Sequence, residues 1–417
     1  MRMSFGGGEL HGRAAPPPSK SHTHRAVFLA AMADGRSRLS NVLLSEDTKA
    51  TIRASEAMGA SFECDGGSLV ADGGNLHPPS GTVDAANSGT TMRIFSGLAS
   101  MFDSRVRIDG DGSLRKRPMG PLLDALAQTG TECTSDGGRP PVTVKGPNRG
   151  GSVRIDGGVS SQFITSLLMA SPMLPNDSEI TVEGNTISEP YLNVTTHMMG
   201  LFGADVKKDG RIFRVRGGTG YRPYDYRIPA DFSSAAFPLV AGALGGDVTV
   251  EGLDMNDPQG DKAIVDILKR AGADVSVDGG SVTVRRSSLS GLEIDIGGVP
   301  DLFPVLAVLL STAKGGSRLY GAPQLRFKES DRIRTTEAML RAIGADIAGT
   351  DDGCIIHGKP ALKGGRIENE GDHRIMMAAA VASLVCESPV EMENAECCAV
   401  SYPSFPEEMK GLGMRVV

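Results

Sequence analysis

The chain of 417 residues has no tryptophan, only 5% aromatic residues and no excess of basic charge. Its 43 lysines and arginines are outnumbered by 50 acids, which gives a formal net charge of −7. A general nucleic-acid-binding protein is usually basic, so this balance argues against nucleic acid as a partner. Glycine, by contrast, is plentiful at 54 residues and widely dispersed, which suits a compact fold with many tight turns.

Further absences narrow the class of protein. No apolar run reaches the roughly 18 residues that a membrane-spanning helix requires, so we do not expect a membrane protein. The opening stretch MRMSFGGGEL lacks a signal-peptide pattern. The six cysteines show no CxxC or zinc-type spacing, so we expect reduced thiols in the cytoplasm. We expect no metal site at His22 and His24, because side chains two residues apart on a helix point away from each other.

A glycine recurs in the same setting six times, with a spacing of about 70 residues. Each copy follows a helical pattern, and a glycine there is typical of a helix C-terminal cap because it adopts positive φ at little cost. In the first five copies a turn and short strands are expected to follow, as in ADVSVDGGSVTVRR, where valines from Val275 to Val284 alternate with polar residues. The anchor positions are Gly59, Gly130, Gly203, Gly272, Gly344 and Gly413.

A second helix is predicted in each repeat, and it is apolar on nearly all sides, which is typical of a buried helix. The stretch DHRIMMAAAVASLV is one example. Each repeat therefore has the predicted order helix, strand, helix, strand, strand. Six such repeats predict an α/β protein of two lobes, each with three repeats and with buried helices surrounded by sheets.

Two proline-containing stretches without an apolar period, AAPPPSKS and GYRPYDYRIPAD, are candidate linkers between the lobes. They predict a continuous lobe of residues 15–228 and a discontinuous lobe of residues 1–14 plus 229–417. A cleft between two lobes is a common place for ligands, so we expect the active site there.

Polar residues gather at the predicted start of every buried helix. Such residues cap free backbone N–H groups, and capping alone accounts for Asp231, Ser233 and Ser234. Capping does not explain Lys20 or Arg374, because a cation at a helix start faces the positive end of the helix dipole. A bound anion would offset that repulsion. The sequence therefore predicts a strongly anionic ligand with phosphate and carboxylate groups, which arginine binds in bidentate fashion.

Seven short segments follow one another along the chain without large gaps: KSHTHRA, NSGTTMR, LRKRPMGPLLDAL, SSQFITSLLMASP, ISEPYL, LRFKESDRIR and GDHRIMM. Together they resemble the 5-enolpyruvylshikimate-3-phosphate synthase family of enolpyruvyl transferases. The resemblance implies an α/β (α+β) fold of two lobes, each with three βαβαββ repeats, arranged as an inside-out barrel with the substrates between the lobes. This agrees with the number of repeats that the glycines indicate.

The resemblance also implies a reaction. The family transfers the enolpyruvyl group of phosphoenolpyruvate to the 5-hydroxyl of shikimate 3-phosphate and releases phosphate, through a tetrahedral adduct, on the way to chorismate and the aromatic amino acids. It implies no cofactor and no metal, no nucleic-acid or membrane partner, and a cytoplasmic monomer. Two anionic substrates must be brought together, so cations and helix ends are needed to offset their repulsion. An acid must protonate the methylene carbon, and a base must take the hydroxyl proton.

The same resemblance implies a role for each matching residue. The catalytic residues would be Asp301 as proton acceptor, Glu329 as proton donor or shuttle, Lys20 and Lys328. Shikimate 3-phosphate is expected at Lys20, Ser21, Arg25, Ser160, Ser161, Gln162, Ser188, Tyr191, Asp301, Gln324 and Lys328. Phosphoenolpyruvate is expected at Lys20, Gly89, Arg117, Gln162, Arg332 and Arg374, with Asn87 and Arg93 shaping the loop at Gly89. A substrate anion would then neutralise Arg374 at its helix start.

Two positions depart from the family pattern. Many members have an asparagine where Gln324 stands, and its longer amide could still bond the substrate. Some members carry a catalytic lysine where the stretch CAVSYPSF offers Val400 or Ser401. One cationic contact to phosphoenolpyruvate is therefore missing or supplied from elsewhere.

Two alternative functions stay open. A UDP-N-acetylglucosamine enolpyruvyl transferase of the same fold typically shows Lys-Asn where this chain has Lys20 and Ser21. It also carries a loop cysteine, for which residues 110–120 offer no match. A non-catalytic anion-binding clamp of the same fold would need neither Asp301 nor Glu329, yet both are present in their expected context.

Overall fold

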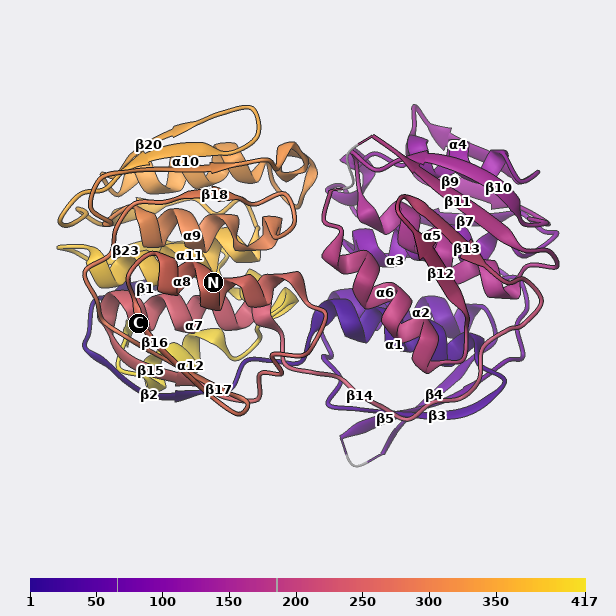
Figure 1. Cartoon of the computed structure of the whole chain (residues 1–417), viewed down its shortest axis with the longest axis horizontal. Coiled ribbons are helices and arrows are strands. Elements are labelled where there is room, and N and C mark those ends of the chain that lie inside the picture. The colour runs from indigo at the N-terminus through magenta and orange to yellow at the C-terminus, as the bar shows by residue number, and fades with distance from the viewer. Residues whose placement is uncertain (66, 185–186) are drawn as a thin grey trace. The chain divides into compact units, whose positions relative to one another are not determined.

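The structure is a computed structural model that describes residues 1–65, 67–184 and 187–417. Its contacts divide the chain into two compact units. One unit joins Met1–Pro17 to Pro229–Val417, and the other runs from Pro18 to Ile228 (Figure 1). We call the first the split unit and the second the continuous unit.

Three buried helices form the centre of the split unit: α7 (Phe232–Gly245), α9 (Phe303–Leu310) and α11 (His373–Ala382). Every residue of these helices is buried, and the helices pack against one another (Figure 1). Their leucine, valine, phenylalanine and alanine side chains supply the apolar burial that stabilises the unit, at about 25 cal/mol per Å². The amphipathic helices are α8 (Ile264–Arg270), α10 (Arg332–Ala342) and α12 (Phe405–Gly411).

Three four-stranded sheets belong to the same unit. The first has the order β22 (Gly365–Ile367), β23 (Val390–Met392), β1 (Met3–Gly6), β24 (Arg415–Val416). The second has the order β16 (Asp274–Asp278), β17 (Ser281–Arg285), β15 (Gly246–Val250), β2 (Leu10–Ala14). The third has the order β18 (Glu293–Asp295), β19 (Gly316–Tyr320), β21 (Cys354–His357), β20 (Asp346–Gly349). Each sheet combines one parallel pair with two antiparallel pairs.

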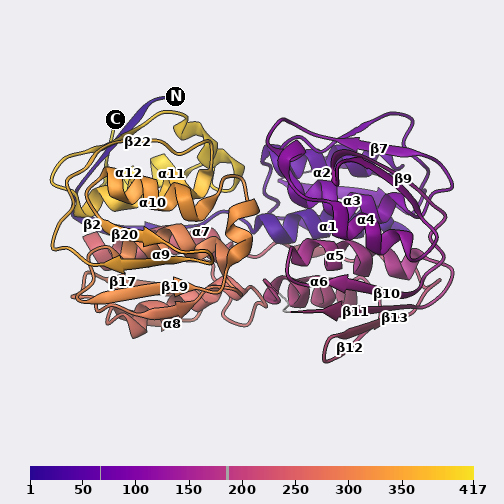
Figure 2. The ribbon, with the colours of Figure 1, turned by 90° about the horizontal axis from the view of Figure 1, so that it is seen from above.

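The continuous unit repeats this design. Its buried helices are α1 (Lys20–Met32), α3 (Gly89–Ala99) and α5 (Ser161–Ala170), and its outer helices are α2 (Glu46–Ala57), α4 (Gly120–Ala127) and α6 (Pro190–Leu201). One sheet has the order β14 (Tyr226–Arg227), β3 (Gly35–Ser40), β5 (Ser68–Gly73), β4 (Ser61–Asp65). The second has the order β6 (Val83–Asp84), β7 (Val106–Asp109), β9 (Arg139–Lys145), β8 (Glu132–Asp136). The third, which lies against α5 and α6 in Figure 2, has the order β10 (Gly151–Asp156), β11 (Ser178–Glu183), β13 (Ile212–Val215), β12 (Val206–Asp209).

The recurring glycines have the conformation that the sequence predicts. All six anchor glycines have φ between 88° and 112°, and each follows the C-terminal end of a helix. This region favours glycine, because a Cβ atom strains the backbone there. The prediction of an α/β fold with buried helices among sheets is confirmed, and the helix ends are where the sequence places them.

The two strands predicted from the alternating valines are confirmed as β16 and β17. Val282 and Val284 of β17 are fully buried. In β16, by contrast, Val277 is 41% exposed. β16 is an edge strand of its sheet, so its apolar side chains have a neighbour on one side only. Among the described residues, no helix is both long enough and apolar enough to span a membrane.

Candidate active site

Six charged side chains meet near the N-terminal ends of the helices of the split unit, and we call them the ion-pair cluster. They are Asp301, Lys328, Glu329, Arg332, Asp372 and Arg374. Asp301 lies in the 3-10 helix η4 (Pro300–Leu302) directly before α9, and Arg332 is the first residue of α10. Three members are acids and three are cations, so their formal charges cancel. The sequence analysis assigns roles to all of them except Asp372, but it did not show that the six contact one another.

Arg332 is the centre of the ion-pair cluster. Its Nη1 atom lies 2.8 Å from Asp301 Oδ1, and its Nε atom lies 2.9 Å from Asp372 Oδ2. Its Nη2 atom donates to Glu329 Oε2 at 2.7 Å. The side chain is only 1% exposed. Burial works to lower the pKa of Arg332, but the three carboxylates outweigh it and raise the pKa above the ordinary value, so the guanidinium stays charged.

Asp372 explains why the buried helix α11 begins with charged residues. It is the N-cap of α11, and its Oδ1 atom accepts a hydrogen bond from the backbone N of Arg374 at 3.0 Å. The side chain is fully buried. Burial works to raise the pKa of Asp372, yet the charge of Arg332 prevails and lowers it. The predicted capping role of Asp231 is confirmed as well, since its side chain accepts from the backbone N of Ser233 at the start of α7.

The expected counter-ion of Arg374 needs a correction. The sequence interpretation gave that role to a substrate anion alone. In the structure, Arg374 Nη2 lies 3.2 Å from Asp301 Oδ2, so a carboxylate of the same unit already balances the cation at the helix start. A substrate anion would have to share Arg374 with Asp301 or displace it.

Asp301 is held by three cations. Besides Arg332 and Arg374, Lys328 Nζ lies 3.5 Å from its Oδ1 atom. The carboxylate side chain is 16% exposed, so it remains within reach of a ligand.

Asp261 was not singled out from the sequence. It is 2% exposed and accepts a hydrogen bond from the Ser233 hydroxyl, while its Oδ1 atom has no hydrogen-bond partner within the described part of the chain. Burial, reinforced by the negative charge of Asp301, raises the pKa of Asp261 to about 7. A carboxyl that binds a proton near neutral pH therefore lies close to the ion-pair cluster. Its only signal in the sequence was an acid just before a short helix.

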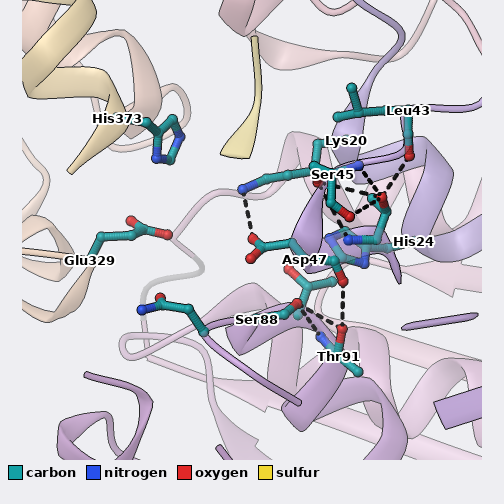
Figure 3. Close-up of polar contacts among 12 residues, drawn as sticks. Lys20, His24, Leu43, Ser45, Asp47, Ser88, Thr91, Glu329 and His373 are labelled. Atoms are coloured by element: carbon teal, nitrogen blue, oxygen red, sulfur yellow. Dashed lines mark hydrogen bonds and ion pairs between the residues drawn. The ribbon is translucent and has the colours of Figure 1, made fainter. Parts of the chain in front are cut away.

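In the continuous unit, Lys20 begins α1 and forms an ion pair with Asp47. Lys20 Nζ lies 3.1 Å from Asp47 Oδ2, and both side chains are largely buried, at 15% and 10% exposed (Figure 3). Asp47 lies in the first turn of α2, where an acid is favourable beside the helix dipole. The sequence interpretation named Lys20 but missed Asp47. An acid at a helix start is common, so that pattern carried no special signal.

Gly89 opens α3 against a guanidinium group. A Cβ atom added at Gly89 would lie 2.9 Å from Arg117 Nη1, which is closer than side-chain carbons approach other atoms. Arg117 Nη2 donates to Asn87 Oδ1 at 2.7 Å, so the arginine is held beside the loop that precedes the helix. Ser88 caps the helix by accepting from the backbone N of Thr91 at 3.1 Å. A helix N-terminus beside a cation is a ready anion-binding arrangement.

Gln162 joins α5 to α3. Its Oε1 atom accepts from Arg93 Nη1 at 2.7 Å, and its Nε2 atom donates to Thr90 Oγ1 at 2.8 Å. Ser160 caps α5 through a hydrogen bond from the backbone N of Gln162 at 3.3 Å. Ser161, the first residue of α5, is buried. Arg93 is thus a support for Gln162 and the α3 loop.

Arg25 is held inside the continuous unit. It is 2% exposed, and its Nε atom donates to Thr195 Oγ1 at 2.9 Å. Its other nitrogens donate to the backbone oxygens of Ser21 at 2.9 Å and Tyr191 at 3.3 Å. Burial lowers the pKa of Arg25 to about 10, which still leaves it charged at neutral pH. Ser188 is buried with φ of 54°, a strained conformation for a residue with a side chain that is often found at functional positions.

The two positions that depart from the family pattern lie in the split unit. Gln324, in the 3-10 helix η5 (Pro323–Phe327), is 5% exposed and donates to the backbone oxygen of Gly297 at 3.3 Å. Ser401 is fully buried and its hydroxyl is uncharged, so it does not replace the cationic contact of the family's lysine. Val400 ends the 3-10 helix η7 (Ala395–Val400).

His22 and His24 bond to different neighbours. His22 Nδ1 lies 3.0 Å from Ser19 Oγ, and His24 Nδ1 lies 2.6 Å from Thr51 Oγ1. Burial lowers the pKa of His22 to about 3 and that of His24 well below its ordinary value, so both rings are neutral. No group of three or more metal-binding side chains was found among the residues that the structure describes.

Comparison with known proteins agrees with this geometry. The family profile of EPSP synthase (3-phosphoshikimate 1-carboxyvinyltransferase) matches residues 5–409. A 3-phosphoshikimate 1-carboxyvinyltransferase from Methanocorpusculum labreanum is 47% identical over 99% of both chains. One from Methanocaldococcus jannaschii is 40% identical over 98% of this chain and 97% of its own. A solved EPSP synthase from Acinetobacter baumannii shares 30% identity and superposes with a TM-score of 0.83 over 100% of this chain and 99% of that chain.

The fold and the clustered cations beside helix starts define a transferase of the carboxyvinyl, or enolpyruvyl, group. The chain belongs to the EPSP synthase family. Its reaction is the enolpyruvyl transfer of the shikimate pathway, from phosphoenolpyruvate to shikimate 3-phosphate, which serves aromatic amino acid biosynthesis.

Proposed function

We propose that Asp301 is the base of this transfer and takes the proton of the 5-hydroxyl of shikimate 3-phosphate. The observation that carries this assignment is the position of Asp301 among three cations at 2.8, 3.2 and 3.5 Å. When the hydroxyl proton moves to Asp301, Arg332 and Arg374 are freed to hold the growing negative charge of the substrates. The attacking oxygen then forms a bond to C2 of phosphoenolpyruvate while the methylene carbon takes a proton and becomes a methyl group. The tetrahedral adduct afterwards loses phosphate from C2 and one methyl proton, which restores the C=C bond of the enolpyruvyl product.

Glu329 is the proposed proton donor to the methylene carbon. Its side chain is 22% exposed and accepts from Arg332 at 2.7 Å, so the same guanidinium holds the acid and the base of the reaction. Lys328 and Lys20 assist by neutralising charge as it develops. Arg332 is buried and contacts both acids, so it holds Asp301 and Glu329 in fixed positions.

The proposed binding roles are those that the family resemblance implies, and local contacts support them. Phosphoenolpyruvate is assigned to the cations and the α3 start, namely Lys20, Gly89, Arg117, Gln162, Arg332 and Arg374. Shikimate 3-phosphate is assigned to Lys20, Ser21, Arg25, Ser160, Ser161, Gln162, Ser188, Tyr191, Asp301, Gln324 and Lys328. Support comes from the helix caps and half-exposed hydroxyls in this set, which have donors to offer a phosphate. Arg25 supports this role least directly, because its nitrogens already donate inside the unit.

The proposal extends to the setting in which the chain works. We propose a cytoplasmic monomer that uses no cofactor or metal and binds no nucleic acid or membrane. Six free thiols support a reducing compartment, and a net charge of −7 argues against a nucleic-acid partner.

Replacing Arg117 tests the phosphoenolpyruvate assignment. We expect Arg117→Ala to weaken phosphoenolpyruvate binding by about 1.5–3 kcal/mol, the usual contribution of a hydrogen bond to a charged group. This corresponds to a rise of roughly 10- to 150-fold in the KM for phosphoenolpyruvate. The KM for shikimate 3-phosphate should change little. Steady-state kinetics with each substrate varied in turn provide the measurement.

The matched control is Arg115→Ala. Arg115 lies two residues away, but its side chain is 55% exposed and forms a surface ion pair with Asp109. It should leave both KM values within about twofold, because a surface ion pair contributes little. Equal effects of the two substitutions would remove Arg117 from the phosphoenolpyruvate site.

A further inference from the structure

A chain of buried polar side chains links three helices of the continuous unit, and we call it the hydroxyl relay. It consists of His24 on α1, Thr51 on α2, and Thr91 and Ser88 at the start of α3. His24 Nδ1 lies 2.6 Å from Thr51 Oγ1, which lies 2.7 Å from Thr91 Oγ1. Thr91 Oγ1 in turn lies 2.7 Å from Ser88 Oγ. All four residues are at most 1% exposed.

The relay is a network rather than a one-way chain. Thr91 Oγ1 can donate to Ser88 Oγ or to the backbone oxygen of Asp47, and Thr51 Oγ1 can donate to Thr91 Oγ1 or to the same backbone oxygen. Burial, with the positive charges of Lys20 and Arg25 nearby, lowers the pKa of His24 and keeps the ring neutral. Its Nε2 atom has no hydrogen-bond partner among the described residues.

The relay also holds the main chain of Asp47. The hydroxyls of Thr51 and Thr91 both lie 3.4 Å from the backbone oxygen of Asp47. The carboxylate of the same residue forms the ion pair with Lys20. The opposite end of the relay is Ser88, the residue directly before Gly89. Lys20 and Gly89 are therefore connected through the same few hydroxyls.

Packing of the core does not require these polar groups. In the split unit the buried helix α9 has the sequence FPVLAVLL, so a buried helix of this fold can pack without hydroxyl groups. A buried hydroxyl must be hydrogen-bonded to avoid a cost of about 1–3 kcal/mol, so an apolar side chain would serve the core equally well. The polar groups of the relay therefore do something other than fill space.

We infer that Thr51 and Thr91 are positioning residues for the phosphoenolpyruvate half of the active site. Their hydroxyls fix the Lys20–Asp47 ion pair relative to the start of α3, so that the lysine and the Gly89 amide face the same anion. Neither threonine is expected to touch the substrate. This inference rests on the proposed assignment of Lys20 and Gly89 to phosphoenolpyruvate.

Valine and serine substitutions separate position from packing. Thr51→Val and Thr91→Val keep the shape of the side chain and remove the hydroxyl, whereas Thr51→Ser and Thr91→Ser keep the hydroxyl. Each valine variant should raise the KM for phosphoenolpyruvate about 5- to 10-fold, the effect of one neutral hydrogen bond. The KM for shikimate 3-phosphate and kcat should change less than about threefold, and the serine variants should recover most of the wild-type KM.

The double variant Thr51→Val/Thr91→Val tests whether the hydroxyls act as one relay. Because the two share the bond at 2.7 Å, the double variant should raise the KM for phosphoenolpyruvate by less than the product of the single effects. Thermal unfolding of every variant shows whether the fold is intact. Valine variants that leave the KM for phosphoenolpyruvate unchanged would overturn the inference. So would variants that alter both KM values equally without rescue by serine, since that is the mark of a merely structural role.

A Lys20→Met variant separates the inference about the two threonines from the assignment of Lys20 to phosphoenolpyruvate, on which it rests. An unchanged KM and kcat for phosphoenolpyruvate in Lys20→Met would mean that the assignment of Lys20 itself fails. A raised KM in Lys20→Met, together with normal valine variants, would mean that only the role of the relay fails. Raised KM values in both sets, with recovery in the serine variants, would support the inference.

Discussion

Asp301→Asn is expected to lose turnover by about 10²- to 10⁴-fold, the usual contribution of a positioned general base. The amide keeps the size of the side chain, but its single oxygen accepts from only one of the two arginines that bond the separate oxygens of Asp301, and it cannot take the 5-hydroxyl proton. Binding of shikimate 3-phosphate should remain within a few-fold of the wild type. Steady-state kinetics give kcat, and calorimetry gives the affinity for shikimate 3-phosphate.

The control for this variant is Asp295→Asn. Asp295 lies in the same unit, but it accepts only from a turn, through the backbone N of Gly297 at 2.9 Å, and asparagine performs that role equally well. It should keep normal kinetics. Near-normal turnover of Asp301→Asn would remove Asp301 from the role of base, and a loss of fold would show as a lower melting temperature in this variant alone.

Arg332→Met is expected to have the largest effect on stability. The substitution leaves three carboxylates without their shared counter-ion, and breaking a buried charge network costs about 3–5 kcal/mol. The variant should also lose activity, because both the acid and the base lose their support. Chemical denaturation of wild type and variant at pH 8 measures the difference in the free energy of unfolding.

The loss of stability should shrink at low pH. Arg332 lowers the pKa of Asp372, so the stability that this ion pair provides is present above the ordinary carboxyl pKa and is lost as the pH falls. Without the arginine, the carboxyls take up protons more readily, and the variant should approach the wild type toward pH 4. Arg366→Met is the control, because its side chain is 65% exposed and its ion pair with Glu393 is 3.5 Å long. Equal unfolding free energies of Arg332→Met and Arg366→Met at pH 8 would contradict the central place of Arg332.

The fold could be predicted from the sequence because the patterns that indicate it lie within short segments of the chain. A glycine that ends a helix is recognised from the neighbouring residues alone, because its role depends only on a positive φ. All six anchor glycines have a positive φ, as Gly272 at φ of 93° illustrates. The buried helices can be recognised from their apolar composition, as the sequence of α9 shows. The exposure of Val277 could not be read in this way, since it depends on which strand lies at the edge of a sheet.

The partners of the charged residues could not be predicted. Arg374 and Asp301 are 73 positions apart, and Arg332 and Asp372 are 40 apart, so only the folded chain brings each pair together. Arg374 at a helix start led to the expectation of a substrate anion, whereas the structure provides Asp301. The residue types alone showed that charge had to be balanced, and the resemblance supplied the roles. Neither gave the ion pair of Lys20 with Asp47.

The most direct test of this account is phosphate release by the full chain. Phosphoenolpyruvate is supplied alone, with shikimate 3-phosphate, and with UDP-N-acetylglucosamine in parallel reactions. Phosphate should appear only when shikimate 3-phosphate is present, in a one-to-one ratio with the enolpyruvyl product, because the family's reaction transfers the enolpyruvyl group to that acceptor. Release that depends on the nucleotide sugar, or no release with shikimate 3-phosphate, would contradict it.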